Sequence, residues 1–175
     1  MKALIILDCQ KGMISGKQFD KELSNIKSLL DYIKEKKGII ISTKHIDYEP
    51  TSIIYFGDKS KSDLESFVES KSDYIIEKST PNIFIQTDLL EILKKNNVDE
   101  VVICGFNAEY CCLFSAIIFN DRGFKVTYIE DATSSVNTPD TYEMPGLDIV
   151  DFVGCILDWS GLIEVLYYEE YLSKY

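Results

Sequence analysis

Apolar residues follow two patterns along this chain, short continuous runs and longer amphipathic stretches. The continuous runs are apolar on both faces, which fits buried parallel strands better than half-exposed antiparallel ones. The intervening stretches repeat apolar residues at helical spacing, so the pattern predicts strands that alternate with helices. The predicted strands lie at Ala3–Leu7, Ile39–Thr43, Tyr74–Glu77, Val101–Cys104 and Lys125–Glu130.

The amphipathic stretches predict the helices. Asp20 and Thr87 are the expected N-caps of two of them, and Gly38 follows the first as glycines often follow helix ends. After Leu147 the chain is apolar and aromatic, which predicts a helix and a short last strand. The expected helices cover residues 20 to about 37, 63–69, 87–96, the cysteine pair to about 121, and 167–175. The short last strand is expected near 162–165.

This alternation is typical of an α/β fold. We expect three layers, α/β/α, with a mostly parallel sheet of about five or six strands and helices on both faces. The 175 residues lie within the usual size of one domain, and no linker or repeat interrupts them, so residues 1–175 are expected to form a single domain. A hydrophobic content of 46% is enough for a substantial core.

Charge indicates which binding partners are unfavourable, and the cysteine content indicates the redox state of the cellular compartment. The net charge is −11 and Arg122 is the only arginine, which argues against nucleic acid and anionic membranes as partners. No apolar run approaches the roughly 20 residues of a membrane span, and the N-terminus reads as a strand rather than a signal peptide. The five cysteines are odd in number and three lie in or beside apolar runs, so we expect a reduced, cytoplasmic protein without disulfides.

Three reactive groups follow predicted strands. Asp8 ends the first strand, Lys78 follows the third, and a turn from Gly105 to the pair Cys111 and Cys112 follows the fourth. Carboxyl ends of parallel strands meet at one edge of the sheet, where ligands bind in such folds. The three groups are therefore expected to lie together although they are far apart in sequence.

These groups fit nucleophilic chemistry. A thiol near a helix N-terminus tends to ionise and to attack carbonyl carbons, and backbone N–H groups of the turn could stabilise the oxyanion. Asp8 would move the proton, and Lys78 would hold Asp8 and favour the thiolate. Helical periodicity does not choose between Cys111 and Cys112, because adjacent positions point about 100° apart and one of the two must be structural.

Each residue also has a structural interpretation. Asp8 could cap a strand end, Lys78 could be solvated, and a cysteine pair is often part of the core. His45 is the only histidine; it could serve a triad but is better read as a pocket-wall or loop residue. Zinc sites usually need more His or Cys than Lys44–Ser60 offers, so no metal is expected. The turn at Gly105 lacks the further glycines of a phosphate-binding loop.

Four blocks of sequence resemble the isochorismatase-like cysteine hydrolases, a family that includes nicotinamidases and N-carbamoylsarcosine amidohydrolases. The resemblance covers the chain to about residue 135, and the blocks stand in the family's order. They are ALIILDCQ with Asp8 and Gln10, EKSTPNIFIQTDL with Lys78, VVICGFNAEYCCLFSA with Cys111, and DRGFKVTYIEDATSS.

The resemblance implies a catalytic triad of Asp8, Lys78 and Cys111, and it selects Cys111 over Cys112. It also implies a cis peptide between Phe106 and Asn107, which would direct the backbone N–H groups of Asn107 and Cys111 at the oxyanion. The expected walls of the substrate pocket are Gln10, Met13, His45, Phe84, Phe106 and Tyr110.

The chain departs from the family in ways that bear on the reaction. Ala108 stands where threonine is usual, and the stretch after the second strand has His45 in place of an Asp/His metal cluster, which argues against a nicotinamidase. The leading hypothesis is a cofactor-free hydrolase that cleaves a non-peptide C–N bond of a small amide or ureide-like molecule through a thioester. The alternatives are an isochorismatase-type vinyl-ether hydrolase, with Asp8 as general acid, and an inactive binding module. The family resemblance also favours a homodimer or a larger homo-oligomer.

Overall fold

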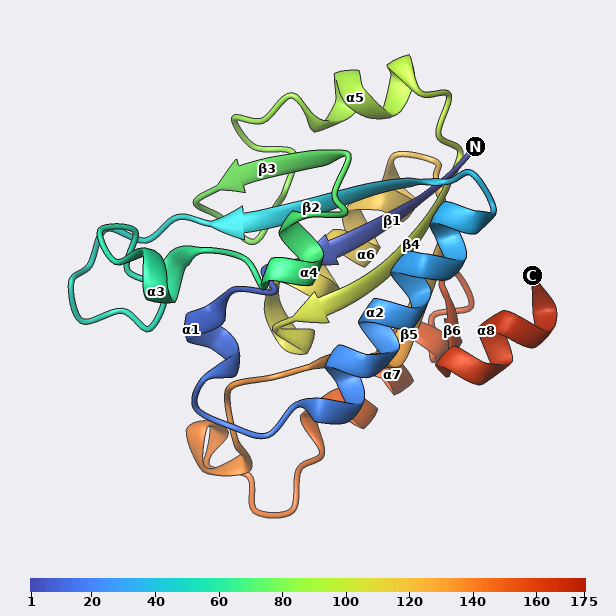
Figure 1. Ribbon diagram of the computed structural model, residues 1–175. Helices are drawn as coiled ribbons and strands as arrows, with labels where there is room; N and C mark the ends of the chain where they lie inside the picture. The colour runs from blue at the N-terminus through green and yellow to red at the C-terminus, as the bar shows by residue number, and fades with distance from the viewer.

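Six parallel strands form the centre of the molecule. The structure is a computed structural model that describes residues 1–175. The strands are hydrogen-bonded in the order β3-β2-β1-β4-β5-β6, and every neighbouring pair is parallel, as Figure 1 shows. The expected α/β/α fold is therefore confirmed. The strands are β1 (Lys2–Leu7), β2 (Ile39–His45), β3 (Tyr74–Lys78), β4 (Glu100–Phe106), β5 (Lys125–Ser134) and β6 (Glu164–Leu166).

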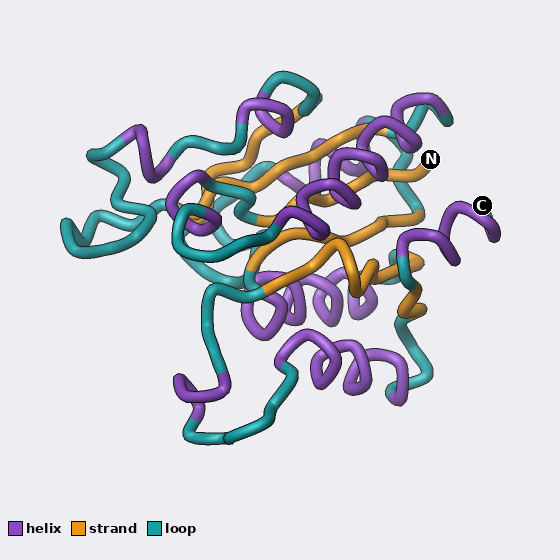
Figure 2. Tube along the Cα trace, turned by 60° about the horizontal axis from the view of Figure 1, so that its bottom comes forward, coloured by secondary structure: helices purple, strands orange, loops and turns teal.

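Helices cover both faces of the sheet, as Figure 2 shows. Apolar residues of α2 and α8 pack in one buried cluster, and those of α5, α6 and α7 pack in the other. None of the helices is long and apolar enough to cross a bilayer. Their bounds are α1 (Lys11–Ile14), α2 (Asp20–Glu35), α3 (Lys59–Ser62), α4 (Ser66–Glu69), α5 (Leu89–Lys95), the π-helix η1 (Ala108–Cys112), α6 (Leu113–Asp121), the 3-10 helix η2 (Pro139–Tyr142), α7 (Ile149–Trp159) and α8 (Tyr168–Lys174).

The two expected N-caps are wrong. The helix α2 begins at Asp20 itself, and α5 begins two residues after Thr87. The Thr87 hydroxyl donates instead to the Ile83 carbonyl oxygen at 2.7 Å, because it lies in a compact turn before the helix. Within the helix expected at 63–69, only Ser66–Glu69 is helical, as the single turn α4, and a separate single turn, α3, precedes the expected range. Local propensity does not fix these ends, because contacts with the rest of the fold compete with capping.

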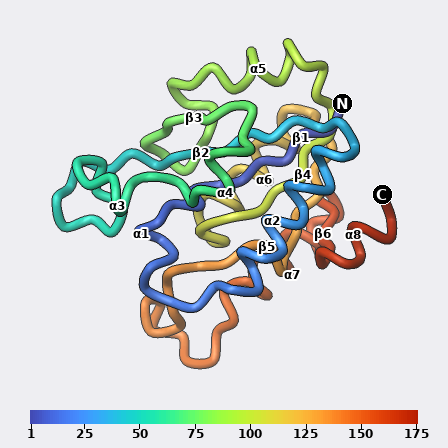
Figure 3. The backbone as a smooth tube through the Cα atoms, viewed as in Figure 1, coloured from blue at the N-terminus to red at the C-terminus, as the bar shows by residue number.

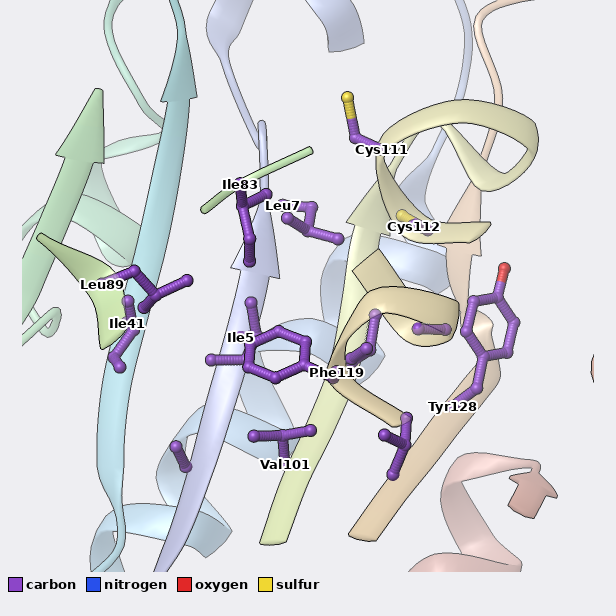
Figure 4. Close-up of a cluster of buried hydrophobic side chains, with 14 of the residues drawn as sticks. Ile5, Leu7, Ile41, Ile83, Leu89, Val101, Cys111, Cys112, Phe119 and Tyr128 are labelled. Carbon is purple, nitrogen blue, oxygen red and sulfur yellow. The ribbon is translucent and has the colours of Figure 1, made fainter. Parts of the chain in front are cut away.

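The apolar strands are buried on both faces, as their sequence indicates. Ile5 and Leu7 of β1 point to one side, where Phe119 of α6 and Leu89 of α5 cover them. Leu4 and Ile6 point to the other side, under Leu29 and Leu30 of α2. In the close-up of Figure 4, Cys111 lies at the arrowhead end of this cluster, beyond Leu7 and Ile83, and its sulfur points away from the packed side chains.

The topology places a ligand-binding edge at the carboxyl ends of β1 and β4. From β1 the chain continues to β2 on one side, and from β4 it continues to β5 on the other side. The space between β1 and β4 is therefore the switch point at which α/β folds bind ligands. Figure 3 shows the long loops after β1, β2 and β5 gathered at that edge, with both termini at the opposite side. Asp8 follows β1 and η1 follows β4, so both groups emerge at the switch point.

Candidate active site

The ammonium group of Lys78 lies at the centre of a buried polar cluster. It donates to Asp8 Oδ2 at 2.6 Å, to Cys111 Sγ at 3.1 Å and to His45 Nδ1 at 3.1 Å. Asp8 is 0%, Lys78 3% and Cys111 6% exposed, whereas His45 is only partly buried. The structure thus brings together the acid, the lysine and the thiol that the sequence places after three different strands.

Thr43 orients the Asp8 carboxylate. Its hydroxyl donates to Asp8 Oδ1 at 2.6 Å and accepts the Asp8 backbone N–H at 3.1 Å. One carboxylate oxygen therefore contacts Thr43 and the other contacts Lys78. The backbone of Asp8 has a φ of 47°, an unfavourable conformation for a residue other than glycine that Asp tolerates better than most, and such residues cluster at functional sites. Thr43 was not among the predicted site residues, although a hydroxyl side chain at the end of an apolar run is a usable signal.

The His45 imidazole is fixed by strand pairing and by Gln10. His45 and Lys78 are partners in the register between β2 and β3, so their side chains leave neighbouring strand ends. Gln10 is fully buried; its amide group donates to the His45 and Ser62 carbonyl oxygens and accepts the His45 backbone N–H at 2.9 Å. Gln10 therefore braces the site from inside instead of lining an open pocket, which corrects its predicted role.

The turn that carries the nucleophile candidate is built around Gly105. Its φ of +116° is a glycine conformation, and a Cβ there would lie 2.2 Å from the Leu7 carbonyl oxygen of the adjacent strand. The next peptide bond, between Phe106 and Asn107, is cis, at the position that the family resemblance implies. The chain then winds through η1, which separates the two thiols: Cys112 is fully buried in the core, and Cys111 contacts Lys78.

Burial and neighbouring charges set the protonation of the cluster. Burial, together with the Asp8 charge, raises the pKa of the Cys111 thiol to about 12. Burial alone would lower the pKa of Lys78, but Asp8 and Cys111 outweigh it and the pKa is raised. Burial and the Lys78 charge lower the pKa of His45. At neutral pH the lysine is therefore charged, while the thiol and the imidazole are neutral.

Asp8, His45 and Cys111 are the residues best placed to hold a metal ion. Each offers a ligand atom, and these atoms lie within 4.8 Å of one another. The Lys78 ammonium, however, is hydrogen-bonded to all three residues and already supplies a positive charge among them. A divalent cation at the same place would have to displace or deprotonate Lys78, so these residues do not fit a metal site as they are arranged.

A second polar network joins η1 to the loop after β5, and the sequence alone did not indicate it. Glu109 Oε1 accepts hydrogen bonds from Ser135 Oγ at 2.8 Å, Asn137 Nδ2 at 2.7 Å and Tyr142 at 2.9 Å. The Tyr142 hydroxyl also lies 3.1 Å from that of Tyr110. These contacts hold the loop against the nucleophile turn. Glu109 stands in the quoted block two residues before Cys111, which is the one signal that could have singled it out.

The aromatic residues expected in the pocket have other places. Phe106 is fully buried and packs edge-to-face on Phe19 in the core beside α2, so its ring cannot line an open pocket. Phe84 packs on Phe119 and beneath the Arg122 guanidinium.

Met13 is buried in the wall of a cavity, and Tyr110 is exposed. Met13 lines a cavity of about 460 Å³ with Ile53 and Val136, among other residues, but Asp8, Lys78 and Cys111 do not line it. Tyr110 is exposed beside the thiol-bearing position.

Comparison with known proteins identifies the family. Residues 2–146 match the family model of the isochorismatase domain, which is most of the chain. The chain belongs to the isochorismatase family. The isochorismatase family protein YrdC of Bacillus subtilis is 30% identical over 143 residues, which span 79% of this chain and 76% of that protein. Nicotinamidase 3 of Arabidopsis thaliana is 27% identical over 148 residues, spanning 77% and 74%.

Solved structures of the same fold include family members described as hydrolases. A cysteine hydrolase from Pseudomonas syringae superposes with a TM-score of 0.82 at 21% identity, over 98% of this chain and 91% of that one. A nicotinamidase from Staphylococcus aureus gives 0.74 at 17% identity, over 94% and 97%. At these identities the likeness shows the fold alone. Family membership makes the chain a hydrolase of the isochorismatase family, and the residue roles and substrate remain to be proposed.

Proposed function

We propose that this protein is a cysteine hydrolase that cleaves a non-peptide C–N bond in a small amide or ureide-like substrate. The proposal rests on the Lys78 ammonium group, which donates hydrogen bonds to both Asp8 and Cys111. All three side chains are almost fully buried. A lysine held between a carboxylate and a thiol stabilises the thiolate as it forms and keeps the carboxylate close enough to take its proton. No cofactor is needed for this chemistry.

The reaction follows from these positions. Cys111 Sγ attacks the carbonyl carbon while its proton passes to Asp8, and the backbone N–H groups of Asn107 and Cys111 stabilise the oxyanion. Asp8 gives the proton to the departing nitrogen as the C–N bond breaks, which leaves a thioester on Cys111. Asp8 then takes a proton from water, whose oxygen attacks the thioester, and passes this proton to the departing sulfur, so that the acid and the free thiol are released. The raised pKa of Cys111 supports a proton transfer coupled to the attack, since the resting thiol is not ionised.

The test measures ammonia or amine release from a panel of small amides and ureides. The wild-type protein is expected to turn over at least one of them, and Cys111→Ala is expected to lose at least about 10³-fold in kcat, as loss of a catalytic nucleophile does. The matched control is Cys155→Ala, which removes an exposed thiol and keeps full activity. Mass spectrometry of the quenched wild-type reaction should show an acyl adduct on the peptide that contains Cys111.

The alternatives give different results in the same variants. If the chain were a vinyl-ether hydrolase with Asp8 as general acid, activity on isochorismate would persist in Cys111→Ala and disappear in Asp8→Asn. If it were an inactive binding module, no substrate would turn over and no adduct would form. Turnover of an amide by Cys111→Ala would end the thioester mechanism.

We also propose that the chain forms a homodimer or larger assembly and is a single cytoplasmic domain. The hydrophobic cluster on one face draws residues from β1 through α7, which supports one domain over 1–175. All five cysteines are free, which supports a reducing compartment. Large apolar side chains are exposed at helical spacing on the outer faces of η1, α6 and α7, where an interface would cover them. They are Tyr110, Phe114, Ile117, Phe152, Ile156 and Trp159.

Sedimentation velocity tests the assembly. Trp159 is 88% exposed, and a charge there would have to be buried in an interface, so Trp159→Glu is expected to sediment as a monomer while the wild type sediments as a larger species. Tyr48→Glu is the matched control, because Tyr48 is an exposed aromatic residue in the loop after β2, away from these helices. A wild-type monomer at micromolar concentration would overturn the assembly and leave the proposed reaction untouched.

A further inference from the structure

His45 is the outward-facing member of the buried cluster around Lys78. Asp8, Lys78 and Cys111 are almost fully buried, whereas His45 is only partly buried, which makes it the most accessible of the four residues. The ligand atoms of His45 and Cys111 lie within 4.8 Å of each other. An imidazole that close to the attacking sulfur is within hydrogen-bonding reach of atoms attached to the carbonyl carbon under attack.

The contact with Lys78 fixes which ring nitrogen carries the proton. A lysine ammonium group has donors only, and Lys78 donates to His45 Nδ1 at 3.1 Å. Nδ1 must therefore present its lone pair, and in the neutral ring the proton lies on Nε2. No residue of the protein accepts a hydrogen bond from that nitrogen, because the bond between Nδ1 and Lys78 is the only hydrogen bond of the ring. The imidazole thus holds a free N–H donor on the edge opposite Lys78.

The charged groups around His45 favour this neutral form. Lys78 at the end of β3 opposes a second positive charge, and Asp8 after β1 and Asp47 in the following loop favour one. Burial and Lys78 outweigh the two carboxylates. Gln10 also holds the His45 backbone at both its N–H and its carbonyl group, which fixes the point from which the ring extends toward Lys78.

We propose that His45 positions Lys78 through Nδ1 and recognises the substrate through Nε2–H, which donates to an acceptor atom outside the carbonyl under attack. This inference rests on the proposed function. It narrows the substrate class to small amides or ureides that carry a second acceptor, such as a carbonyl oxygen or a heteroaromatic nitrogen, close to the scissile bond. A substrate with an ammonium group at that place is excluded, because it would face both a donor and the Lys78 charge.

Nuclear magnetic resonance tests the tautomer without any substrate. His45 is the only histidine, so a long-range ¹H–¹⁵N spectrum of the whole protein contains a single imidazole. We expect Nδ1 to give the shift of an unprotonated nitrogen and Nε2 that of a protonated one at pH 7.5. In Lys78→Met the tautomer with the proton on Nδ1 should become measurably populated, since the donor to Nδ1 is gone. A protonated Nδ1 in the wild type would overturn the inference.

Two variants separate the two roles of the ring. In His45→Asn the amide oxygen can replace Nδ1 as the acceptor for Lys78, but nothing occupies the place of Nε2. In His45→Gln the amide nitrogen can replace Nε2 as donor, but the acceptor for Lys78 is lost. We expect His45→Asn to raise KM roughly tenfold or more with kcat nearly kept, and His45→Gln to lower kcat by a similar factor with KM nearly kept.

The outcomes distinguish this inference from the proposed function. If Cys111→Ala abolishes turnover but His45→Asn leaves KM unchanged, His45 does not recognise the substrate and the inference is overturned while the thioester reaction stands. If Cys111→Ala keeps its activity, the proposed function fails, and the recognition role of His45 fails with it. A matched substrate pair sharpens the result: removal of the second acceptor from the substrate should raise KM for the wild type and leave KM for His45→Asn unchanged.

Discussion

Replacement of Lys78 by methionine is the most demanding test of the cluster. The Asp8–Lys78 pair has an N–O distance of 2.6 Å and both side chains are fully shielded from solvent. Lys78→Met keeps the length and the apolar part of the side chain but leaves the Asp8 carboxylate buried without its counter-ion. Loss of one partner of such a pair costs about 3–5 kcal/mol, a large part of the 5–15 kcal/mol that typically stabilises a domain.

The assay is urea unfolding at pH 7.5, with thermal melting as a second measurement. For a chain of this size, a loss of about 3–5 kcal/mol corresponds to a fall in Tm of roughly 6–20 °C. The double variant Asp8→Asn/Lys78→Met removes both charges and is the matched control. It should be more stable than Lys78→Met alone, because it leaves no uncompensated buried charge. The reasoning is refuted if Lys78→Met costs under about 1 kcal/mol, or if the double variant is no more stable than the single one.

The pH dependence of this pair has a definite sign. The pKa of Lys78 is raised above its ordinary value of 10.5 by Asp8 and Cys111, which overcome the opposing effect of burial. A raised pKa means that the folded state holds the proton more tightly than the unfolded state. The contribution of Lys78 to stability is therefore fully present below pH 10.5 and is lost as the pH rises through the folded-state pKa. The stability of the wild type relative to the double variant should fall in that range.

Three further predictions concern other parts of the site. Alkylation of Cys111 by iodoacetamide should accelerate about tenfold per pH unit from pH 7 to 10, because its pKa is raised to about 12; a plateau below pH 9, seen by peptide mass spectrometry, would contradict this. Glu109→Gln should lose about 1–3 kcal/mol in urea unfolding, since three donors lose a charged acceptor, and an unchanged midpoint would argue against the network. Gly105→Ala should cost more than about 3 kcal/mol or prevent folding, whereas Gly16→Ala, in open space, should be nearly neutral.

The position of the reactive residues at the strand ends is the part of the site that could be predicted from the sequence. Continuous apolar runs predict buried parallel strands, and parallel strands place their carboxyl ends at one edge, so Asp8, Lys78 and the cysteine turn could be placed together from the sequence. The periodicity could not choose between Cys111 and Cys112, and only the family resemblance did so. The structure agrees, because the π-helical turn points one thiol at Lys78 and the other into the core.

What the sequence determined by itself is the fold class, the strand order along the chain and the residue types at the reactive edge. Tertiary structure alone decided which side chains meet. Thr43 reaches Asp8, and His45 reaches Lys78, through the register between neighbouring strands, and Glu109 binds a loop that follows another strand. Phe106 reads as a pocket residue in the sequence but is core in the structure. Hydrophobic periodicity reports the face on which a residue lies, whereas hydrogen-bond partners depend on distances between elements that no local pattern encodes.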